Sequence, residues 1–330
     1  KFVMYYKNKS VDVKKMESMV QKEIEALKRI NSDHVLKIYD TIYFDRQGVA
    51  MVLECCDGGE LKAFVDERFR RGNPITEDEA IYYLSQIMLG FSAMYKERIS
   101  HRDFKLENIL VRGEEIVIAD FGFAAVDSCE NRTVLGSKHT MAPEVIFNKK
   151  GDHYDDRLDL WSIGICFYYL LFKEYPFNYN TPNEKLKEQY LNHTGSNLRI
   201  PQGHWGRPVS ACSIELLKRL IVYDPNHRIK WREFFNHPIF DGFKRRAVAN
   251  PDFTSDSMVR VATRFEHYCH DLNLTAPQDR REIPMNDLSK TSRDQEYSFV
   301  SDFIGLAEVA GNSLPNSFLG SFMSRGLAIL

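Results

Sequence analysis

The beginning of the chain combines strand-like and helix-like patterns of apolar residues. Residues 1–7 and 49–55 are short runs of apolar, β-branched or aromatic side chains, which are typical of β-strands. Residues 16–30 lie between these runs and carry apolar side chains at the spacing of one helical face: Met16, Met19, Val20, Ile24, Leu27 and Ile30. This part of the chain is therefore predicted to mix strand and helix.

The middle of the chain is predicted to be mainly α-helical. A helix is expected to begin after Thr76, because Thr is a favoured N-cap residue and Glu79 follows three residues later. Further helical patterns cover residues 157–172 and 212–223. The Asp-Gly-Gly sequence at 57–59 separates the two parts with turn-forming residues, where a hinge between two lobes would lie.

The character of the chain changes after Phe240. Residues 241–330 are rich in Pro, Ser, Thr and Asp and end in a Gly-, Ser- and Phe-rich stretch, so this tail is expected to be partly disordered. A segment near 257–272 is amphipathic, with one apolar helical face formed by Met258, Val261, Ala262, Phe265, Tyr268, Cys269 and Leu272. It is expected either to fold back on the core or to bind a partner, and folding back is favoured because such stripes are more often core than interface.

Charge and cysteine content narrow the class of protein. The 330 residues hold 44 Lys and Arg against 46 Asp and Glu, and this net charge of -2 gives no general attraction to nucleic acid or anionic membranes. The 6 cysteines include no CxxC pair, which suits reduced thiols, and no apolar run is long enough to span a membrane. A cytoplasmic protein is expected. Because the chain opens on Lys1 rather than Met, within a strand-like run, it is expected to be a fragment or a processed product.

Three short motifs follow one another in the helical part. They are His101-Arg102-Asp103-Phe104-Lys105-Leu106-Glu107-Asn108, Asp120-Phe121-Gly122 and Met141-Ala142-Pro143-Glu144. An apolar strand pattern separates the first from the second; 12 residues lead from Asn108 to Asp120 and 24 from Asp120 to Glu144. Each motif alone could be a turn or a helix start, but their order and spacing together are very specific. Over about residues 1–240 the chain resembles the protein kinase superfamily.

The resemblance implies a site for phosphoryl transfer from ATP to a protein hydroxyl. The Mg²⁺ that accompanies ATP prefers hard oxygen ligands, and the Asp120 carboxylate and the Asn108 amide oxygen would supply them. Asp103 would orient the hydroxyl and accept its proton, while Lys105 would neutralise the γ-phosphate. This lysine is typical of serine/threonine kinases, because tyrosine kinases usually lack it.

An ion pair in the ATP site is also implied by the resemblance. Glu23 resembles the glutamate of the small-lobe helix, which pairs with a lysine that binds the α- and β-phosphates. Lys1 and Lys7 are both candidates for this lysine. Lys1 is favoured, because Tyr5 would otherwise stand where the family keeps a small residue against adenine.

Residues 51–60 resemble the hinge that binds the adenine and ribose of ATP. Leu53 would be the gatekeeper residue, and Glu54 and Cys56 would offer backbone groups to adenine. Glu60 would lie near the ribose. Because backbone contacts tolerate many side chains, no thiol chemistry is expected of Cys56.

Several further residues match structural positions of the family. Asp159 would brace the catalytic loop by accepting its backbone N–H groups, and Arg228 would pair with Glu144. A spine joining the lobes would consist of Leu27, Ile38, His101 and Phe121.

The segment before Glu144 implies regulation and one departure from the family. Arg102 implies control by a phosphorylated loop residue, with Ser128 and Thr133 as candidates. Ser137 would bridge Asp103 and Lys105. Thr140 stands where the family usually has a tyrosine.

We therefore expect a two-lobed α+β kinase fold over residues 1–240, with a small sheet-plus-helix lobe at 1–56 that lacks its first strands and the glycine-rich loop. The large helical lobe would cover 57–240 and the tail 241–330. The cofactors would be ATP and Mg²⁺ and the partners protein substrates. The hinge and the 154–161 run look closest to the calmodulin-dependent-like and autophagy-initiating kinase branches. The alternative is a pseudokinase that uses the lobe as a binding surface.

Overall fold

The computed structural model describes residues 1–4, 13–44, 48–126, 137–147, 156–201 and 208–241. All of them belong to one structural unit, Lys1–Asp271. Four sequence predictions lie outside the described residues: Lys7, Ser128, Thr133 and the amphipathic segment near 257–272. In the described parts of the chain, no helix is both long and apolar enough to cross a bilayer.

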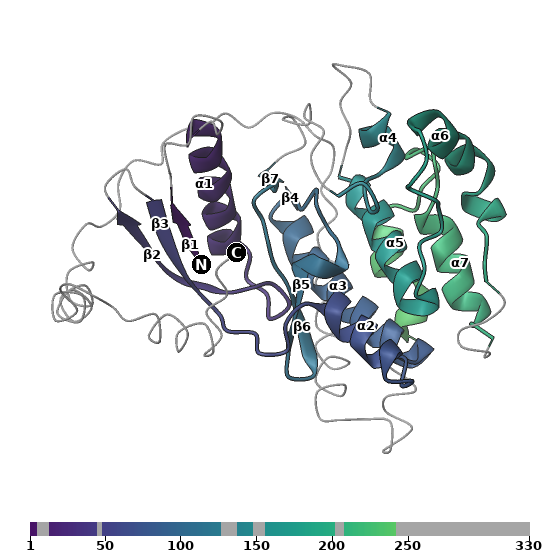
Figure 1. Cartoon of the computed structure of the whole chain (residues 1–330), viewed down its shortest axis with the longest axis horizontal. Helices are drawn as coiled ribbons and strands as arrows, with labels where there is room; N and C mark the ends of the chain where they lie inside the picture. Colours follow the sequence, from purple (N-terminus) through teal and green to yellow (C-terminus); the bar gives the residue numbers. More distant parts are fainter. Residues whose placement is uncertain (5–12, 45–47, 127–136, 148–155, 202–207, 242–330) are drawn as a thin grey trace. The chain divides into compact units, whose positions relative to one another are not determined.

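A three-stranded antiparallel sheet with one helix beside it forms the small lobe (Figure 1). The strands are β1 (Phe2–Met4), β2 (Ile38–Phe44) and β3 (Gly48–Leu53), in the order β1-β3-β2. The helix α1 (Val13–Arg29) places Val20 and Ile24 against Val49 and Met51 of the central strand. Burial of these apolar side chains holds the helix on the sheet, and the predicted strand and helix are confirmed.

Strand β2 was not predicted from the sequence. It lies at the edge of the described sheet, where Tyr39 and Tyr43 are 65% and 59% exposed. A half-buried strand shows apolar residues alternating with polar ones, and these exposed aromatic side chains obscure that pattern.

The predicted helix after Thr76 is confirmed as α3 (Glu77–Lys96), the central helix of the large lobe. Its capping box is complete, because Thr76 accepts the backbone N–H of Glu79 while the Glu79 carboxylate accepts that of Thr76. The remaining helices are α2 (Leu61–Arg70), α4 (Pro143–Ile146), α5 (Leu158–Phe172), α6 (Asn183–Asn192), α7 (Ala211–Leu220) and α8 (Trp231–Phe235). A one-turn 3₁₀ helix, η3 (Gly195–Asn197), follows α6.

Two small antiparallel pairs of strands complete the large lobe. One pairs β4 (Ile99–Ser100) with β7 (Ala125–Val126), and the other is the hairpin of β5 (Ile109–Arg112) and β6 (Glu115–Ile118). Ile118 also bonds to the loop after α1: its N–H donates to the His34 carbonyl and its carbonyl accepts the Leu36 N–H, both at 2.9 Å. Helices and small antiparallel sheets thus coexist, and the predicted α+β class is confirmed.

Candidate active site

The carboxylate of Asp103 lies at the centre of the candidate site. The residue is 4% exposed, and its Oδ1 accepts the backbone N–H of Ser137 at 2.7 Å. Its Oδ2 lies 3.0 Å from Lys105 Nζ, which also donates to Ser137 Oγ at 2.8 Å. A carboxylate, an ammonium group and a hydroxyl are therefore held together at this point of the large lobe.

Asn108 ends the 3₁₀ helix η1 (Leu106–Asn108) and faces back toward Asp103. Its Nδ2 donates to the Asp103 carbonyl at 2.9 Å, and its own carbonyl accepts the Ala119 N–H at 2.8 Å. Because the amide nitrogen is used, the amide oxygen is the atom that a cation would meet.

Asp120 follows the end of β6 and has a left-handed backbone conformation, with φ at 62°. Asp tolerates this region better than most residues because its short polar side chain can interact locally. Within the described residues, no group of three or more His, Cys, Asp and Glu side chains could hold a metal ion.

Asp159, in α5, braces the start of the catalytic loop. It is 1% exposed and accepts the N–H groups of His101 and Arg102 at 2.8 and 2.9 Å. Burial raises the pKa of this carboxyl, although the two backbone hydrogen bonds favour its ionised form. The backbone of His101 is therefore held in place by Asp159. The Nε2 atom of the His101 ring lies 3.0 Å from the Ala119 carbonyl, and the centroid of this ring lies 5.0 Å from that of the Phe121 ring.

Lys1 and Glu23 form an ion pair in the small lobe. Lys1 Nζ lies 2.9 and 2.8 Å from the two carboxylate oxygens of Glu23, which is 3% exposed. The carbonyl of Lys1 accepts the Met51 N–H at 2.8 Å, so the lysine is aligned beside β3. Of the two candidate lysines, the structure brings Lys1 to Glu23, and Lys7 lies outside the described residues.

The three hinge residues differ in their surroundings. The Glu54 N–H donates to the Lys37 carbonyl at 2.9 Å. Cys56 is half-buried, and burial raises the pKa of its thiol to about 11. Glu60 is exposed at the N-cap of α2 and its side chain makes no capping hydrogen bond. The structure thus leaves the carboxylate of Glu60 at the surface.

The sequence prediction missed Arg112, whose guanidinium donates to the side chain of Glu54. Its single sequence signal is the facing charge of Glu115 across the β5–β6 turn. Nothing local in the sequence connects Arg112 with a hinge residue 58 positions away.

Thr140 is 4% exposed, and its carbonyl accepts the Ser162 hydroxyl at 2.8 Å. The neighbouring His139 is exposed and stacks on Tyr175, with ring centroids 5.0 Å apart. The exposed ring of this turn is therefore that of His139, next to the buried Thr140.

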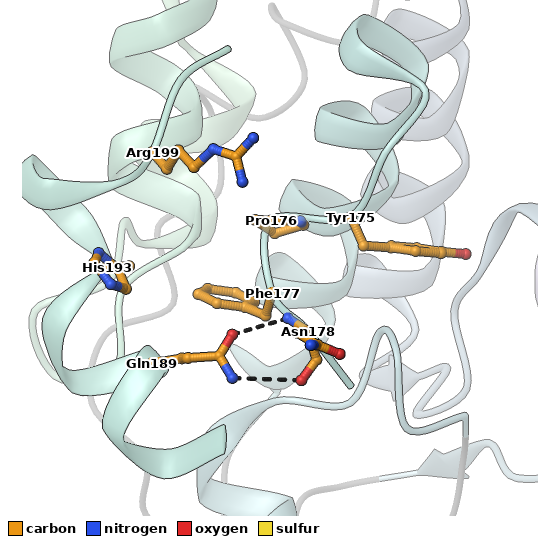
Figure 2. A pocket seen from close by; sticks show the side chains of 7 residues that line it. All are labelled: Tyr175, Pro176, Phe177, Asn178, Gln189, His193 and Arg199. Carbon is orange, nitrogen blue, oxygen red and sulfur yellow. Dashed lines mark hydrogen bonds between the residues drawn. The ribbon is translucent and has the colours of Figure 1, made fainter. Parts of the chain in front are cut away.

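A cavity of about 540 Å³ lies in the large lobe, and none of the predicted site residues lines it (Figure 2). The Gln189 side chain holds the loop on one side of it, because its Oε1 accepts the Asn178 N–H at 2.9 Å and its Nε2 lies 3.4 Å from the Asn178 carbonyl. The lining residues are Tyr175, Pro176, Phe177, Asn178, Gln189, His193 and Arg199.

The amino-acid sequence is similar to a protein family and to several known proteins, all of them kinases. Residues 1–240 match the family described as protein kinase domain. The chain is 33% identical over 242 residues to serine/threonine-protein kinase ULK3 of Rattus norvegicus, covering 71% of this chain and 47% of that protein. It is 30% identical over 223 residues to serine/threonine-protein kinase atg1 of Dictyostelium discoideum, covering 65% of this chain and 31% of that protein.

A third similarity involves a shorter protein. The Aurora kinase of Encephalitozoon cuniculi is 30% identical over 221 residues, which cover 66% of this chain and 76% of that protein. The chain spans about half the length of the ULK3 proteins it matches, 47% for Rattus norvegicus and 45% for Xenopus laevis.

Proposed function

The chain belongs to the protein kinase family, and on that premise we propose that it transfers the γ-phosphoryl group of ATP to serine or threonine hydroxyls of proteins. The observation that carries the proposal is the cluster of Asp103, Lys105 and Ser137, joined by contacts of 2.7 to 3.0 Å. The serine/threonine kinases ULK3 and atg1 among its relatives support the same type of acceptor.

In the proposed reaction, Asp103 orients the acceptor hydroxyl and takes its proton while that oxygen attacks the γ-phosphorus. The bond between the γ-phosphorus and the β–γ bridging oxygen breaks, and ADP leaves with that oxygen. Lys105 stabilises the negative charge on the transferred group, and Ser137 keeps its ammonium beside Asp103. The residues supply positioning and charge rather than a covalent intermediate.

Asp120 and Asn108 are proposed to hold Mg²⁺, because a carboxylate and an amide oxygen are the hard donors that this cation prefers. When bound, Mg²⁺ shields the charge of the phosphates. The Asn108 amide fits this role, since its nitrogen is already bonded to the Asp103 carbonyl.

ATP is proposed to bind with its α- and β-phosphates at Lys1, which Glu23 orients. The backbone groups of Glu54 and Cys56 would receive adenine, and Glu60 would lie near the ribose. The exposure of the Glu60 side chain is consistent with contact to a ligand.

The domain assignment proposed from the sequence is a kinase domain at 1–240, with lobes at 1–56 and 57–240, and a tail at 241–330. The relatives ULK3 and atg1 support the likeness to the autophagy-initiating branch, without assigning a pathway. We propose a cytoplasmic location, supported by free thiols at Cys56 and Cys166. Protein substrates are the proposed partners, and a partner for the tail is a further proposal.

The test is Mg²⁺-dependent transfer of labelled phosphate to a generic protein substrate by the full protein, by Asp120→Ala and by Asp103→Asn. Asp241→Ala, at the exposed end of the described chain, serves as a control for loss of a carboxylate. We expect transfer by the unchanged protein and the control and at least about a hundredfold less by the two site variants. If no form of the protein transferred phosphate or bound ATP, the result would favour the alternative, a pseudokinase that uses the lobe as a binding surface.

A further inference from the structure

Arg112, the last residue of β5, connects three segments that are distant in the sequence. Its Nη1 donates to the carboxylate of Glu54 in the hinge. Its Nη2 donates to the Asp33 carbonyl at 3.0 Å, in the loop after α1, and to Glu115 at 2.9 Å on the facing strand. One guanidinium group thus connects the hinge to both the hairpin and the loop that follows α1.

The contact between Arg112 and Glu54 is shielded from water. Their side chains are 25% and 11% exposed. Burial alone would lower the pKa of Arg112, but its hydrogen bonds with Glu54 and Glu115 raise the pKa overall. Without the guanidinium, the Glu54 carboxylate would keep, among the described residues, only the Lys37 N–H at 3.4 Å, and would be a poorly hydrated charge without its ion-pair partner, which proteins avoid by rearranging.

A second attachment lies at the other end of the hinge. The Gly58 N–H donates to the Val111 carbonyl at 3.0 Å, and the Val111 N–H donates to the Gly59 carbonyl at 2.8 Å. A Cβ atom on residue 58 would lie 2.6 Å from Val111 Cγ1, so this close approach requires glycine. Residues 55–57 therefore form a short loop whose two ends are fixed to consecutive residues of one strand.

We propose that Arg112 is a positioning residue for nucleotide binding, which holds Glu54 against β5 and so fixes the backbone groups of Glu54 and Cys56 that receive adenine. The inference rests on the proposed function, because that function assigns adenine to these groups. Arg112 itself touches no part of the nucleotide; it acts through Glu54.

The expected effect is on nucleotide affinity rather than on the chemical step. Without Arg112, the Glu54 end of the hinge is held, within the described parts of the chain, by the Lys37 backbone alone, through the Glu54 N–H at 2.9 Å and the Glu54 carboxylate at 3.4 Å. The hinge then populates the binding arrangement only part of the time, and the apparent affinity falls by that fraction. Once nucleotide saturates the site, Asp103 and Lys105 are unaffected. Loss of Arg112 therefore raises the Kd and the KM for ATP and preserves kcat.

The experiment compares Arg112→Met with Arg68→Met in the full protein. Arg68 is a matched control, because its side chain is 22% exposed and also joins two segments, through Glu79 and the Asn73 carbonyl. Calorimetry with MgATP and steady-state kinetics give Kd, KM and kcat. Hydrogen exchange without nucleotide reports on the Glu54 and Gly58 amides, which are both hydrogen-bonded.

We expect Arg112→Met to raise Kd and KM for ATP about tenfold, to change kcat less than about twofold, and to speed exchange at Glu54 and Gly58. Arg112→Lys should recover part of the affinity, because it keeps a cation at Glu54 but loses the second arm to Asp33. Glu54→Gln should weaken ATP binding in the unchanged protein and have little further effect in Arg112→Met. Arg68→Met should lower the melting temperature with KM unchanged.

The inference is overturned if Arg112→Met leaves KM and hinge exchange unchanged, or if it alters stability and KM only as Arg68→Met does. The outcome that overturns the proposed function is different: no form would bind MgATP. In that case faster exchange at Glu54 and Gly58 in Arg112→Met would still support the attachment of the hinge, and unchanged exchange would overturn it.

Discussion

Arg228 and Glu144 form a buried ion pair between segments 84 residues apart, with Nη1–Oε1 and Nη2–Oε2 distances of 2.7 and 2.9 Å. The Arg228 side chain is 0% exposed, and its guanidinium also donates to the Arg157 and Val222 carbonyls. Glu144 is the second residue of α4 and follows the turn in which Ser137 contacts Asp103, so the pair connects this turn to the segment between α7 and α8.

Breaking this pair should strongly destabilise the protein. Arg228→Met leaves the Glu144 carboxylate without its cation, and we expect the free energy of unfolding to fall by about 3–5 kcal/mol. Urea unfolding measures this. The control variant Arg219→Met removes an arginine that pairs with Glu233 at the surface. This change should lower the free energy of unfolding by less than about 1 kcal/mol. Equal losses in the two variants would contradict the prediction.

Removing the Ser137 hydroxyl should slow transfer without weakening nucleotide binding. Ser137→Ala loses the bond from Lys105 Nζ but keeps the backbone N–H bond to Asp103. We expect kcat to fall about tenfold, with the KM for ATP changed less than about twofold. Ser137→Thr retains a hydroxyl and should retain kcat. If kcat fell as much in Ser137→Thr as in Ser137→Ala, the hydroxyl group of residue 137 would have no role in the transfer step.

The Cys56 thiol should react slowly at neutral pH. Burial raises its pKa to about 11, so the thiolate is a minor species until the solution is strongly alkaline. Iodoacetamide should label the exposed Cys55 first, and labelling of Cys56 should rise about tenfold per pH unit toward its pKa. Mass spectrometry measures the labelling rate at each of the two positions. Saturating MgATP should lower the labelling rate of Cys56 further. Equal labelling of Cys55 and Cys56 at neutral pH would disprove the prediction.

Asp66 should contribute stability that is lost in acid. Burial alone would raise the pKa of this carboxyl, but hydrogen bonds from Lys173, Lys62 and Tyr169 lower the pKa below its ordinary value of 3.8. A carboxyl whose pKa is lowered by folding stabilises the protein above its unfolded-state pKa, and this contribution disappears as the pH falls through the folded-state pKa.

Asp66→Asn should therefore lower the free energy of unfolding by about 1 kcal/mol near neutral pH, since the group remains partly exposed. The difference from the unchanged protein should shrink below about pH 4. Urea unfolding at several pH values tests this. A difference that stays constant down to the acid limit would show that Asp66 acts through packing and not through its charge.

Local patterns predicted the parts of the structure that depend on neighbours in sequence. The Thr76–Glu79 capping box needs residues only three positions apart, and both of its hydrogen bonds form. Asp103, Lys105 and Asn108 belong to one short motif, so their proximity follows from the motif itself. Their roles in catalysis stay predictions.

Long-range partners could not be read from such patterns. The spacing to Glu23 did not decide between Lys1 and Lys7, because the choice depends on the register of β1 on β3, and residues six apart in a strand point to the same side. The sequence gave no signal for the contact between Arg112 and Glu54, because that contact exists only when the hairpin packs under the hinge. Charged residues of surface hairpins are usually solvated, and sequence alone does not distinguish the exceptions.

The β5–β6 hairpin holds both ends of the proposed nucleotide site. Val111 and Arg112 fix the hinge, while Ala119, directly after β6, bonds to Asn108 and precedes Asp120. The length of the hairpin therefore sets the distance between the hinge, where adenine is proposed to bind, and Asp120, where the phosphates are proposed to bind. Insertions confined to the hairpin turn, next to Gly113 with its φ of 59°, leave the pairing of the two strands and this distance unchanged. One residue inserted within either strand would slip the register, turn Arg112 or Ile118 to the opposite face and change the length that the ligand must match.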